Sequence, residues 1–416
     1  FLIFIFCSYF WTSIEIPFDN LEKVVGQLTI LNYNPANDTY RFIFLISLTV
    51  GIFFFTRLYQ EKRTVNLKSY LSSNSFKTLK TFDILDCKFF ILLLILYIFV
   101  DFFSINPGYY FYDPLHDGDN LTPSLNLLFS GKIWSSSFTI HGAANAIYGF
   151  LGWKFFGLET IGALRYFHII FLLITKFIVL ILAYQISKLS SLDVNVKKIF
   201  FFFLSLVLIN FISYEFPLNY SPISYRDFYI LIYLIFLIQF FSSSNLNNYI
   251  LFFLTIWANI TIIIHYDTGT YINFLHIVLF IYLILIKKIN SIIVIFSTYI
   301  VFWLVFILIF SQTETQFLFD HYRHIVSYMD YFHGIKFPQP IFDIGFNKDA
   351  ARATKSLLIL VISSCTIINF FLSKKEKEFP TNAKIIFIFL LILSMILFKN
   401  ALGRSDSYHI KSSGEF

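Results

Sequence analysis

Acidic and histidine side chains gather in one short string of the sequence, residues 113–120 (DPLHDGDN). Gly118 permits a tight bend, so the carboxylates of Asp117 and Asp119, two residues apart in a non-helical loop, can point into one site. A carboxylate pair beside His116 suits a general base or a ligand of a divalent cation such as Mg²⁺ or Mn²⁺. The alternative is a solvated acidic turn that caps a helix. We therefore predict His116, Asp117 and Asp119 as catalytic residues, with the two aspartates as ligands if a metal is used.

Other short strings hold side chains that can bind a substrate. A guanidinium group grips phosphate through two donors, and an imidazolium adds positive charge. The substrate-binding candidates are His265, Asp267, Arg226, Arg323, Arg404, Asp406 and His409. For each string a plainer interpretation stays open: a solvated turn at 265–269, a local ion pair at 225–227, and a capped helix end at 403–409.

Composition excludes a soluble domain. Hydrophobic residues form 57% of the 416, charged residues form 13%, and the mean hydropathy is +0.71, so the chain needs lipid as its solvent. The net charge is +6, but lysine and arginine lie between apolar runs instead of on one basic face, so we expect no nucleic-acid partner. Cys7, Cys87 and Cys365 are far apart and lack the spacing of a metal site.

Apolar runs of membrane-spanning length recur along the chain. A bilayer core of about 30 Å needs about 20 helical residues, and a continuous apolar run without alternation indicates a helix. Counting a short first run at 1–11, the predicted spans are 41–57, 88–104, 162–186, 199–214, 228–242, 250–264, 272–287, 291–310, 355–372 and 385–398. The sequence thus predicts an all-α polytopic membrane protein of about 11 transmembrane helices.

The distribution of cations predicts the orientation. If 58–87 is cytoplasmic, the connections on that side hold 16 lysines and arginines, whereas the other side holds 14 in more than twice the length. Seven of the nine histidines then fall in outer connections. We expect a multi-pass protein of a bacterial cytoplasmic (inner) membrane with its reactive residues facing outward.

Two short helices are predicted within the outer connection 105–161. Thr122 and Pro123 favour the start of the first, and Gly131 its end. The second has apolar residues at helical spacing over 147–155 and ends at Gly157. Both are too short to span, so we expect interfacial helices, with Trp134 and Trp153 at the level of the lipid headgroups.

This order of features resembles the first outer loop of the GT-C glycosyltransferases, membrane enzymes that use polyprenyl-phosphate sugars. The resemblance covers about 85–416, where the runs 291–310 and 355–372 also flank a long outer loop as in the family. It implies that Asp117 or Asp119 is the catalytic base or a metal ligand. Two features differ from the family pattern: spans precede the loop, and a glycine separates the two acids.

The favoured hypothesis is transfer of a sugar with inversion. A lipid-linked donor enters from the membrane lipids, Arg404 contacts its phosphate, and Asp117 or Asp119 deprotonates a glycan, lipid or protein acceptor, without a soluble cofactor. We divide the chain into 1–87, with N-terminal spans and a basic cytoplasmic loop, and 88–416, the catalytic module; both ends look like cuts in a longer protein. A polysaccharide polymerase or ligase, dependent on 311–354, and a transporter without enzymatic activity remain alternatives.

Overall fold

The computed structural model describes residues 2–18, 20, 23–60, 83–104, 117–189, 193–211, 226–243, 246–333, 348–372 and 381–403. Within these ranges the chain forms helices and no strands, which confirms the all-α prediction. Each predicted apolar run overlaps one helix. These helices are α1 (Leu2–Tyr9), α3 (Ala36–Gln60), α5 (Lys88–Ser104), α8 (Ile161–Leu189), α9 (Val194–Phe211), α10 (Arg226–Ser242), α11 (Asn248–Ile264), α12 (Tyr266–Leu285), α13 (Ile289–His333), α14 (Lys348–Leu372) and α15 (Thr381–Leu402).

Six of the described helices are long and apolar enough to cross a bilayer: α3, α8, α12, α13, α14 and α15. The other helices are shorter. α5, α10 and α11 have 17 residues each, which gives a length of about 25 Å against a core of about 30 Å. The predicted count of eleven spans is therefore not confirmed, because an apolar run can form a helix without reaching the length that a bilayer demands.

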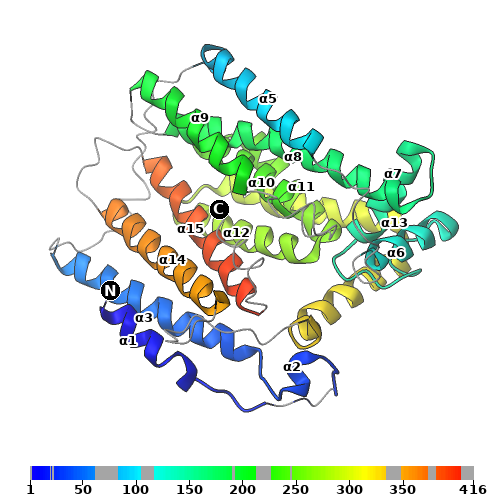
Figure 1. Ribbon diagram of the computed structural model, residues 1–416, viewed down its shortest axis with the longest axis horizontal. Coiled ribbons are helices and arrows are strands. Elements are labelled where there is room, and N and C mark those ends of the chain that lie inside the picture. The colour runs from blue at the N-terminus through cyan, green and yellow to red at the C-terminus, as the bar shows by residue number, and fades with distance from the viewer. Residues whose placement is uncertain are drawn as a thin grey trace. The chain divides into compact units, whose positions relative to one another are not determined.

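Contacts divide the chain into two units, which we describe separately. Unit 1 contains 1–73 and 324–416, and unit 2 contains 74–323, whereas the sequence-based division was placed at residue 87. In unit 1, α3 packs against α1, α14 and α15 (Figure 1). Its core includes the buried side chains of Leu45, Leu357 and Phe398. The short elements η1 (Trp11–Ser13) and α2 (Gln27–Ile30) precede α3.

Unit 2 begins with η2 (Ile84–Cys87) and joins α5 to α8 and α9, α8 to α10, and α10 to α11 and α12. Polar groups link these apolar helices. Lys176 of α8 forms an ion pair with Asp101 of α5. Tyr97 of α5 donates a 2.5 Å hydrogen bond to Asn210 of α9. Burying Lys176 beside a carboxylate lowers the cost of placing an ammonium group in an apolar bundle.

Two short helices, α6 (Gly118–Ser130) and α7 (Ala144–Phe156), lie where the sequence predicts them. Both end at a glycine of positive φ, Gly131 at 68° and Gly157 at 67°, as expected. The predicted start of α6 at Thr122 is wrong. The backbone amides of Asn120 and Leu121 already donate to the carbonyl of Asp117, so the helix begins at Gly118 and includes Pro123.

The two tryptophans near these helices are buried in unit 2, so their predicted place among lipid headgroups is wrong. Trp134 is 1% exposed and packs on Phe306 and Phe310 of α13, with ring centroids 5.7 and 5.5 Å apart. Trp153 is 5% exposed and donates from Nε1 to the carbonyl of Thr160 at 2.9 Å. Both indoles bury their apolar area against neighbouring elements instead.

Candidate functional site

The candidate site is built around Asp117, the residue directly before α6. Its carboxylate accepts a 2.8 Å hydrogen bond from the guanidinium of Arg165 near the start of α8, and both side chains are buried. Asp119 lies in the first turn of α6 and is partly exposed. The expected non-helical loop around Asp119 is therefore wrong, since an acidic residue is favoured in the first turn, where backbone amides point outward.

The first turns of α6 and α7 are joined by hydrogen bonds. The side-chain amide of Asn145 donates to the side-chain oxygen of Asn120 at 3.4 Å, and the Ser124 hydroxyl donates to the carbonyls of Asn145 and Ala146 at 3.1 and 3.0 Å. The Asn145 side-chain oxygen also accepts from the backbone amide of His141 at 2.9 Å. These bonds fix the start of α7 against α6.

The connection 131–143 is hydrogen-bonded to the residues where α11 ends and α12 begins. The Ala143 amide donates to the Ile263 carbonyl, and the Tyr266 amide donates to the His141 carbonyl, both at 3.0 Å. Gly142 has φ +106°, and a Cβ there would lie 2.6 Å from the Ile264 carbonyl oxygen. Only glycine allows this approach, so the contact is encoded by one residue.

His265 brings a third helix start to the same place. It is fully buried, and its Nδ1 accepts from the Thr268 amide at 3.5 Å, which caps α12. The rings of His141 and His265 are stacked with centroids 5.8 Å apart. We call the three helix starts at 117–120, 141–145 and 265–268, together with Arg165, the junction. Three helix N-termini and one guanidinium group meet at the junction, and both kinds of group favour a nearby negative charge.

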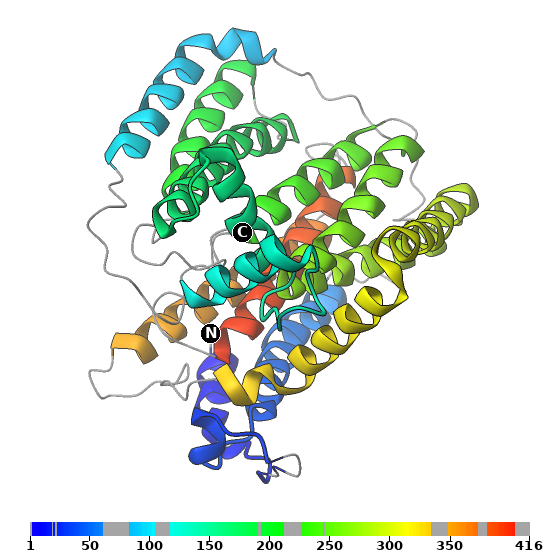
Figure 2. The same ribbon diagram turned by 90° about the vertical axis from the view of Figure 1, so that its right-hand side faces the viewer.

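The Glu314 carboxylate on α13 binds the backbone of the connection 131–143. α13 is broken at Ser311, where φ is 69° and ψ 160°, and Glu314 lies in the segment after the break (Figure 2). At about 1.5 Å per residue, the whole of α13 is too long for one crossing, so this segment extends beyond the span. The Glu314 carboxylate accepts from the amides of Ile133, Trp134 and Ser135 at 3.2, 3.0 and 3.3 Å, and from the Ser135 hydroxyl.

These bonds favour the ionised form of Glu314. Burial by itself raises the pKa of this carboxyl group, but the Ser135 hydroxyl and the backbone amides donate to it and hold the pKa below its usual value. The carboxylate therefore works as a fixed acceptor for the connection.

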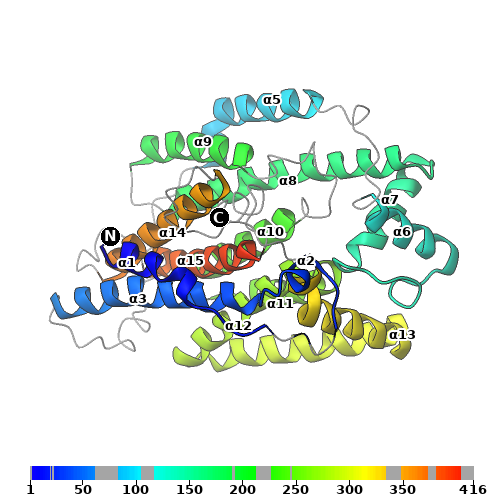
Figure 3. The same cartoon turned by 60° about the horizontal axis from the view of Figure 1, so that its bottom comes forward.

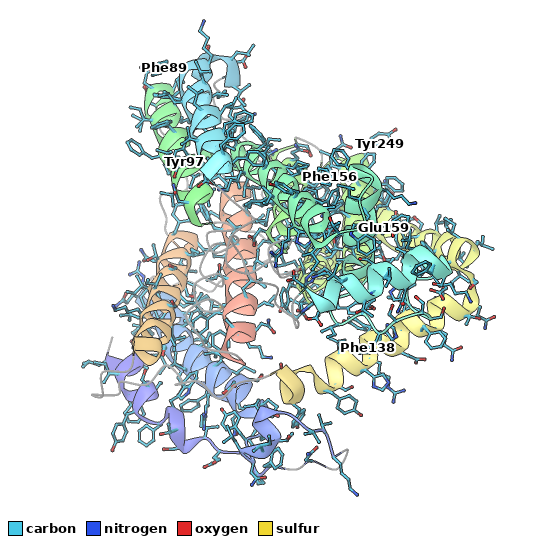
Figure 4. All side chains as sticks on the ribbon, turned by 45° about the vertical axis from the view of Figure 1, so that its right-hand side comes forward. Phe89, Tyr97, Phe138, Phe156, Glu159 and Tyr249 are labelled. Atoms are coloured by element: carbon cyan, nitrogen blue, oxygen red, sulfur yellow. The ribbon has the colours of Figure 1, made fainter. Side chains whose placement is uncertain are left out.

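A second contact joins the same segment of α13 to the connection and to α12. The Thr139 hydroxyl lies 3.1 Å from the hydroxyl of Tyr266 and 3.4 Å from Nδ1 of His321. Phe138, on the side of the connection that faces α13 (Figure 4), meets the His321 ring edge-on at 4.7 Å. His321 therefore supports the connection by packing and polar contact.

No group of three histidine, cysteine or carboxylate side chains that could bind a metal occurs in the described part of the chain. Asp117, one of the two predicted metal ligands, is already engaged by Arg165. Asp117 therefore fits the role of an arginine-bound carboxylate better than that of a Mg²⁺ or Mn²⁺ ligand.

The structure brings part of the predicted site together. Asp117, Asp119 and His265 belong to the junction, and Asp267 lies partly exposed in the first turn of α12. The residues around Asp267 form the start of a helix and not the predicted turn, since only His265 separates α11 from α12. Arg323 is exposed on α13.

The remaining candidates cannot be placed. His116, Arg404, Asp406 and His409 lie outside the described residues. Arg226 is the first residue of α10, but its side chain lies outside the described part as well. Their predicted convergence on the site stays a prediction.

Sequence reasoning missed Arg165, Asn145 and Glu314. Arg165 was counted within the span 162–186, although an arginine there needs a buried partner or water and is a signal in itself. Glu314 follows a long apolar run by four residues, and Asn145 lies just before the helical pattern predicted over 147–155. Nothing in the local sequence shows that their partners lie up to 181 residues away.

No protein-family model matches the sequence, and no curated protein and no solved structure matches it significantly. The geometry of the junction is therefore the basis for a functional proposal.

Proposed function

We propose that the protein is a membrane glycosyltransferase that moves a sugar from a polyprenyl-phosphate donor to an acceptor hydroxyl at the outer face of a bacterial cytoplasmic membrane. One observation carries the proposal: at the junction, a partly exposed carboxylate, Asp119, lies beside a buried pair, Asp117 and Arg165, where three helices begin. Soluble and lipid-linked acceptors, including a glycan or a protein, suit the same chemistry.

The junction supplies the two elements that such a transfer requires. The acceptor hydroxyl gives its proton to Asp119 while its oxygen forms a bond to the anomeric carbon. The bond from that carbon to the phosphate oxygen breaks, and the electron pair leaves with the polyprenyl phosphate. Helix amides and Arg165 stabilise the negative charge of the leaving phosphate. Attack opposite the leaving group inverts the anomeric carbon.

Asp117 and Asp119 have different roles in this proposal. Asp117 is buried and bound to Arg165, so its role is to orient Arg165 and the start of α6. Asp119 is the better base because solvent and an acceptor can reach it. Arg404 and His409 remain candidates for a second cation on the phosphate.

The test is transfer in proteoliposomes that contain the full chain. Polyprenyl phosphates carrying radiolabelled glucose, mannose or galactose serve as donors, and a cell-envelope extract supplies acceptors. We expect loss of label from the donor lipid with the natural chain and with Asp320→Asn, an exposed aspartate on α13, but not with Asp119→Asn. Equal transfer by the two variants would reject Asp119 as the base.

A transporter is the second candidate, favoured by the Lys176–Asp101 pair between α8 and α5. Ionisable residues among apolar helices often line a transport path. If this candidate is right, Lys176→Met abolishes uptake of a solute into vesicles while Asp119→Asn retains it. The glycosyltransferase proposal requires the opposite order of sensitivity in the transfer assay.

A further inference from the structure

An open groove lies in unit 1, where α1 and α14 both lie alongside α3 (Figure 3). Its volume is about 730 Å³, within the range of about 300–1,000 Å³ that small-molecule sites occupy. Phe4 of α1 and Val361 of α14 line it and are buried, whereas Ile52 of α3 and Ile362 of α14 line it at 41% and 56% exposure. The groove is therefore a recess between helices that opens at the surface of the unit.

The lining of the groove changes from apolar to polar along two helices. α3 and α14 qualify as membrane-spanning helices by length and composition, and they run in the same direction (Figure 1). The lining residues in their last two turns include four polar ones: Thr56, Arg57, Thr366 and Asn369. The lining residues before these are mostly apolar and include Ile52, Phe53, Leu358, Val361 and Ile362. In a bilayer the groove therefore offers apolar contacts in the hydrocarbon core and polar contacts near one surface.

Arg57 gives the polar end of the groove its positive charge. Its side chain is partly buried, and Nη1 donates a 2.9 Å hydrogen bond to the side-chain oxygen of Gln60, a neutral residue. A guanidinium group has five N–H donors in a planar fork, which suits a phosphate group as a further partner. Asn369 is exposed at the same end, and its side-chain amide adds donors for a phosphate oxygen.

The two threonines at this end offer acceptors instead of donors. The hydroxyls of Thr56 and Thr366 donate to the carbonyls of Ile52 and Ile362 at 2.7 and 2.8 Å, so each presents its oxygen to a ligand. A ligand that carries both a phosphate and free hydroxyl groups complements such a set of donors and acceptors. The glycerol headgroup of phosphatidylglycerol has both.

We propose that this groove binds an anionic phospholipid of the phosphatidylglycerol type, with its phosphate at Arg57 and an acyl chain along the apolar lining of α3 and α14. Basic sites between membrane-spanning helices at the cytoplasmic surface attract anionic lipids. The distribution of cations predicts that surface for the connection 58–87, which follows α3. By filling the recess, the lipid stabilises the packing of α1 and α14 on α3. The inference is independent of the proposed function, because no residue of the groove takes part in the proposed reaction.

The test uses phosphatidylglycerol with a photoreactive diazirine on an acyl chain, added below saturation to the full chain in phosphatidylcholine proteoliposomes. We expect irradiation to label the residues of α3 and α14 that line the groove, as mapped by mass spectrometry of peptides. Arg57→Gln should weaken this labelling about fivefold, the change in affinity that one cation near an anionic lipid contributes. Arg57→Lys should retain most of it, because the positive charge is kept.

Lys288→Gln is the matched control. Lys288 is an exposed cation that follows α12, is predicted on the same side of the membrane and does not line the groove. Equal labelling of Arg57→Gln and Lys288→Gln would overturn the proposal, as would the absence of label from the groove, which is expected if a protein helix covers it. Equally strong labelling of the natural chain by a phosphatidylcholine probe would also overturn it. That comparison needs no variant, so it decides the question even if Arg57→Gln fails to fold.

Discussion

In each unit of the protein a buried aspartate lies beside an arginine, and the two sites are built differently. In unit 1, Asp38 of α3 accepts a 2.5 Å hydrogen bond from the Tyr33 hydroxyl, to which Arg41 donates at 3.1 Å. Arg41 also donates from Nε to the Ile14 carbonyl at 2.8 Å. In unit 2, the Asp117 carboxylate is bound by Arg165, 48 residues away.

The arrangement around Asp38 is a structural anchor, whereas the arrangement around Asp117 has the features of a functional site. Tyr33, Asp38 and Arg41 lie close together in sequence at the start of α3, and Arg41 joins Ile14 to that helix. The junction instead gathers Asp117, Asn145 and His265 from separate helices and keeps Asp119 within reach of solvent. Local hydrogen bonds are enough to satisfy buried polar groups. Bringing polar groups together from distant helices costs more conformational entropy, and it is typical of functional sites.

The largest expected contrast concerns activity. Asp119→Asn should lower the rate of sugar transfer by about a hundred- to ten-thousand-fold, the usual contribution of a general base. Asp38→Asn should leave the rate per folded molecule nearly unchanged, because the Asp38 side chain takes no part in the proposed reaction. Initial rates in proteoliposomes, normalised to folded protein, measure both. Similar losses in the two variants would remove the distinction between anchor and site.

The next contrast concerns stability. Arg165→Met leaves the buried Asp117 carboxylate without its guanidinium, which should lower the free energy of unfolding by about 3–5 kcal/mol. Arg41→Met should cost less, about 1–3 kcal/mol, because it removes hydrogen bonds to a hydroxyl and a carbonyl. Denaturation in detergent micelles compares them. The double variant Asp117→Asn, Arg165→Met should be more stable than Arg165→Met; if it is less stable, the ion pair is not what holds the two residues.

Glu314→Gln tests how strongly the Glu314 carboxylate stabilises the connection 131–143. It should lower the free energy of unfolding by about 1.5–3 kcal/mol, since bonds to a charged acceptor are replaced by weaker ones. Because the folded protein holds the pKa of Glu314 below its usual value of 4.5, its contribution is complete above that pH and is lost as the pH falls through the lowered pKa. Thermal unfolding at a series of pH values from 7 downward should show a smaller acid loss in the variant than in the natural chain. Parallel curves would mean that Glu314 is not held ionised.

The smallest contrast uses two glycines near the junction. Gly142→Ala should destabilise the protein by about 1–3 kcal/mol, because its φ of +106° and the Ile264 carbonyl leave no room for a Cβ. A Cβ at Gly118 meets nothing within 4 Å, so Gly118→Ala should change stability by less than about 1 kcal/mol. Chemical denaturation of both variants checks the difference. Equal effects would show that the connection 131–143 does not pack closely against the residues between α11 and α12.

Much of the fold was predictable because the long helices of this chain coincide with contiguous apolar runs in the sequence. Glycines after α6 and α7 marked their ends correctly, since a left-handed residue is a local requirement. The start of α6 was not, because a bond to the Asp117 carbonyl outweighed the capping preference of Thr122. The number of spans stays a prediction beyond the six helices that qualify, because helices of 17 residues such as α5 and α11 are apolar but shorter than the bilayer core.

The candidate site was predictable only in part, for a related reason. Asp117, Asp119 and His265 were found by type and spacing along the chain. Arg165 and Glu314 were missed because their roles depend on partners that only the fold supplies. Sequence spacing identifies residues able to do chemistry, whereas their pairing is a property of tertiary structure.

The most direct test of the central claim is labelling of Asp119→Cys in a chain whose native cysteines, Cys7, Cys87 and Cys365, are replaced by serine. A membrane-impermeant maleimide is applied from outside intact cells, with and without added polyprenyl-phosphate sugar. The account predicts rapid labelling that the lipid-linked sugar slows. Labelling only from the cytosolic side, or a rate that the sugar lipid leaves unchanged, would contradict it.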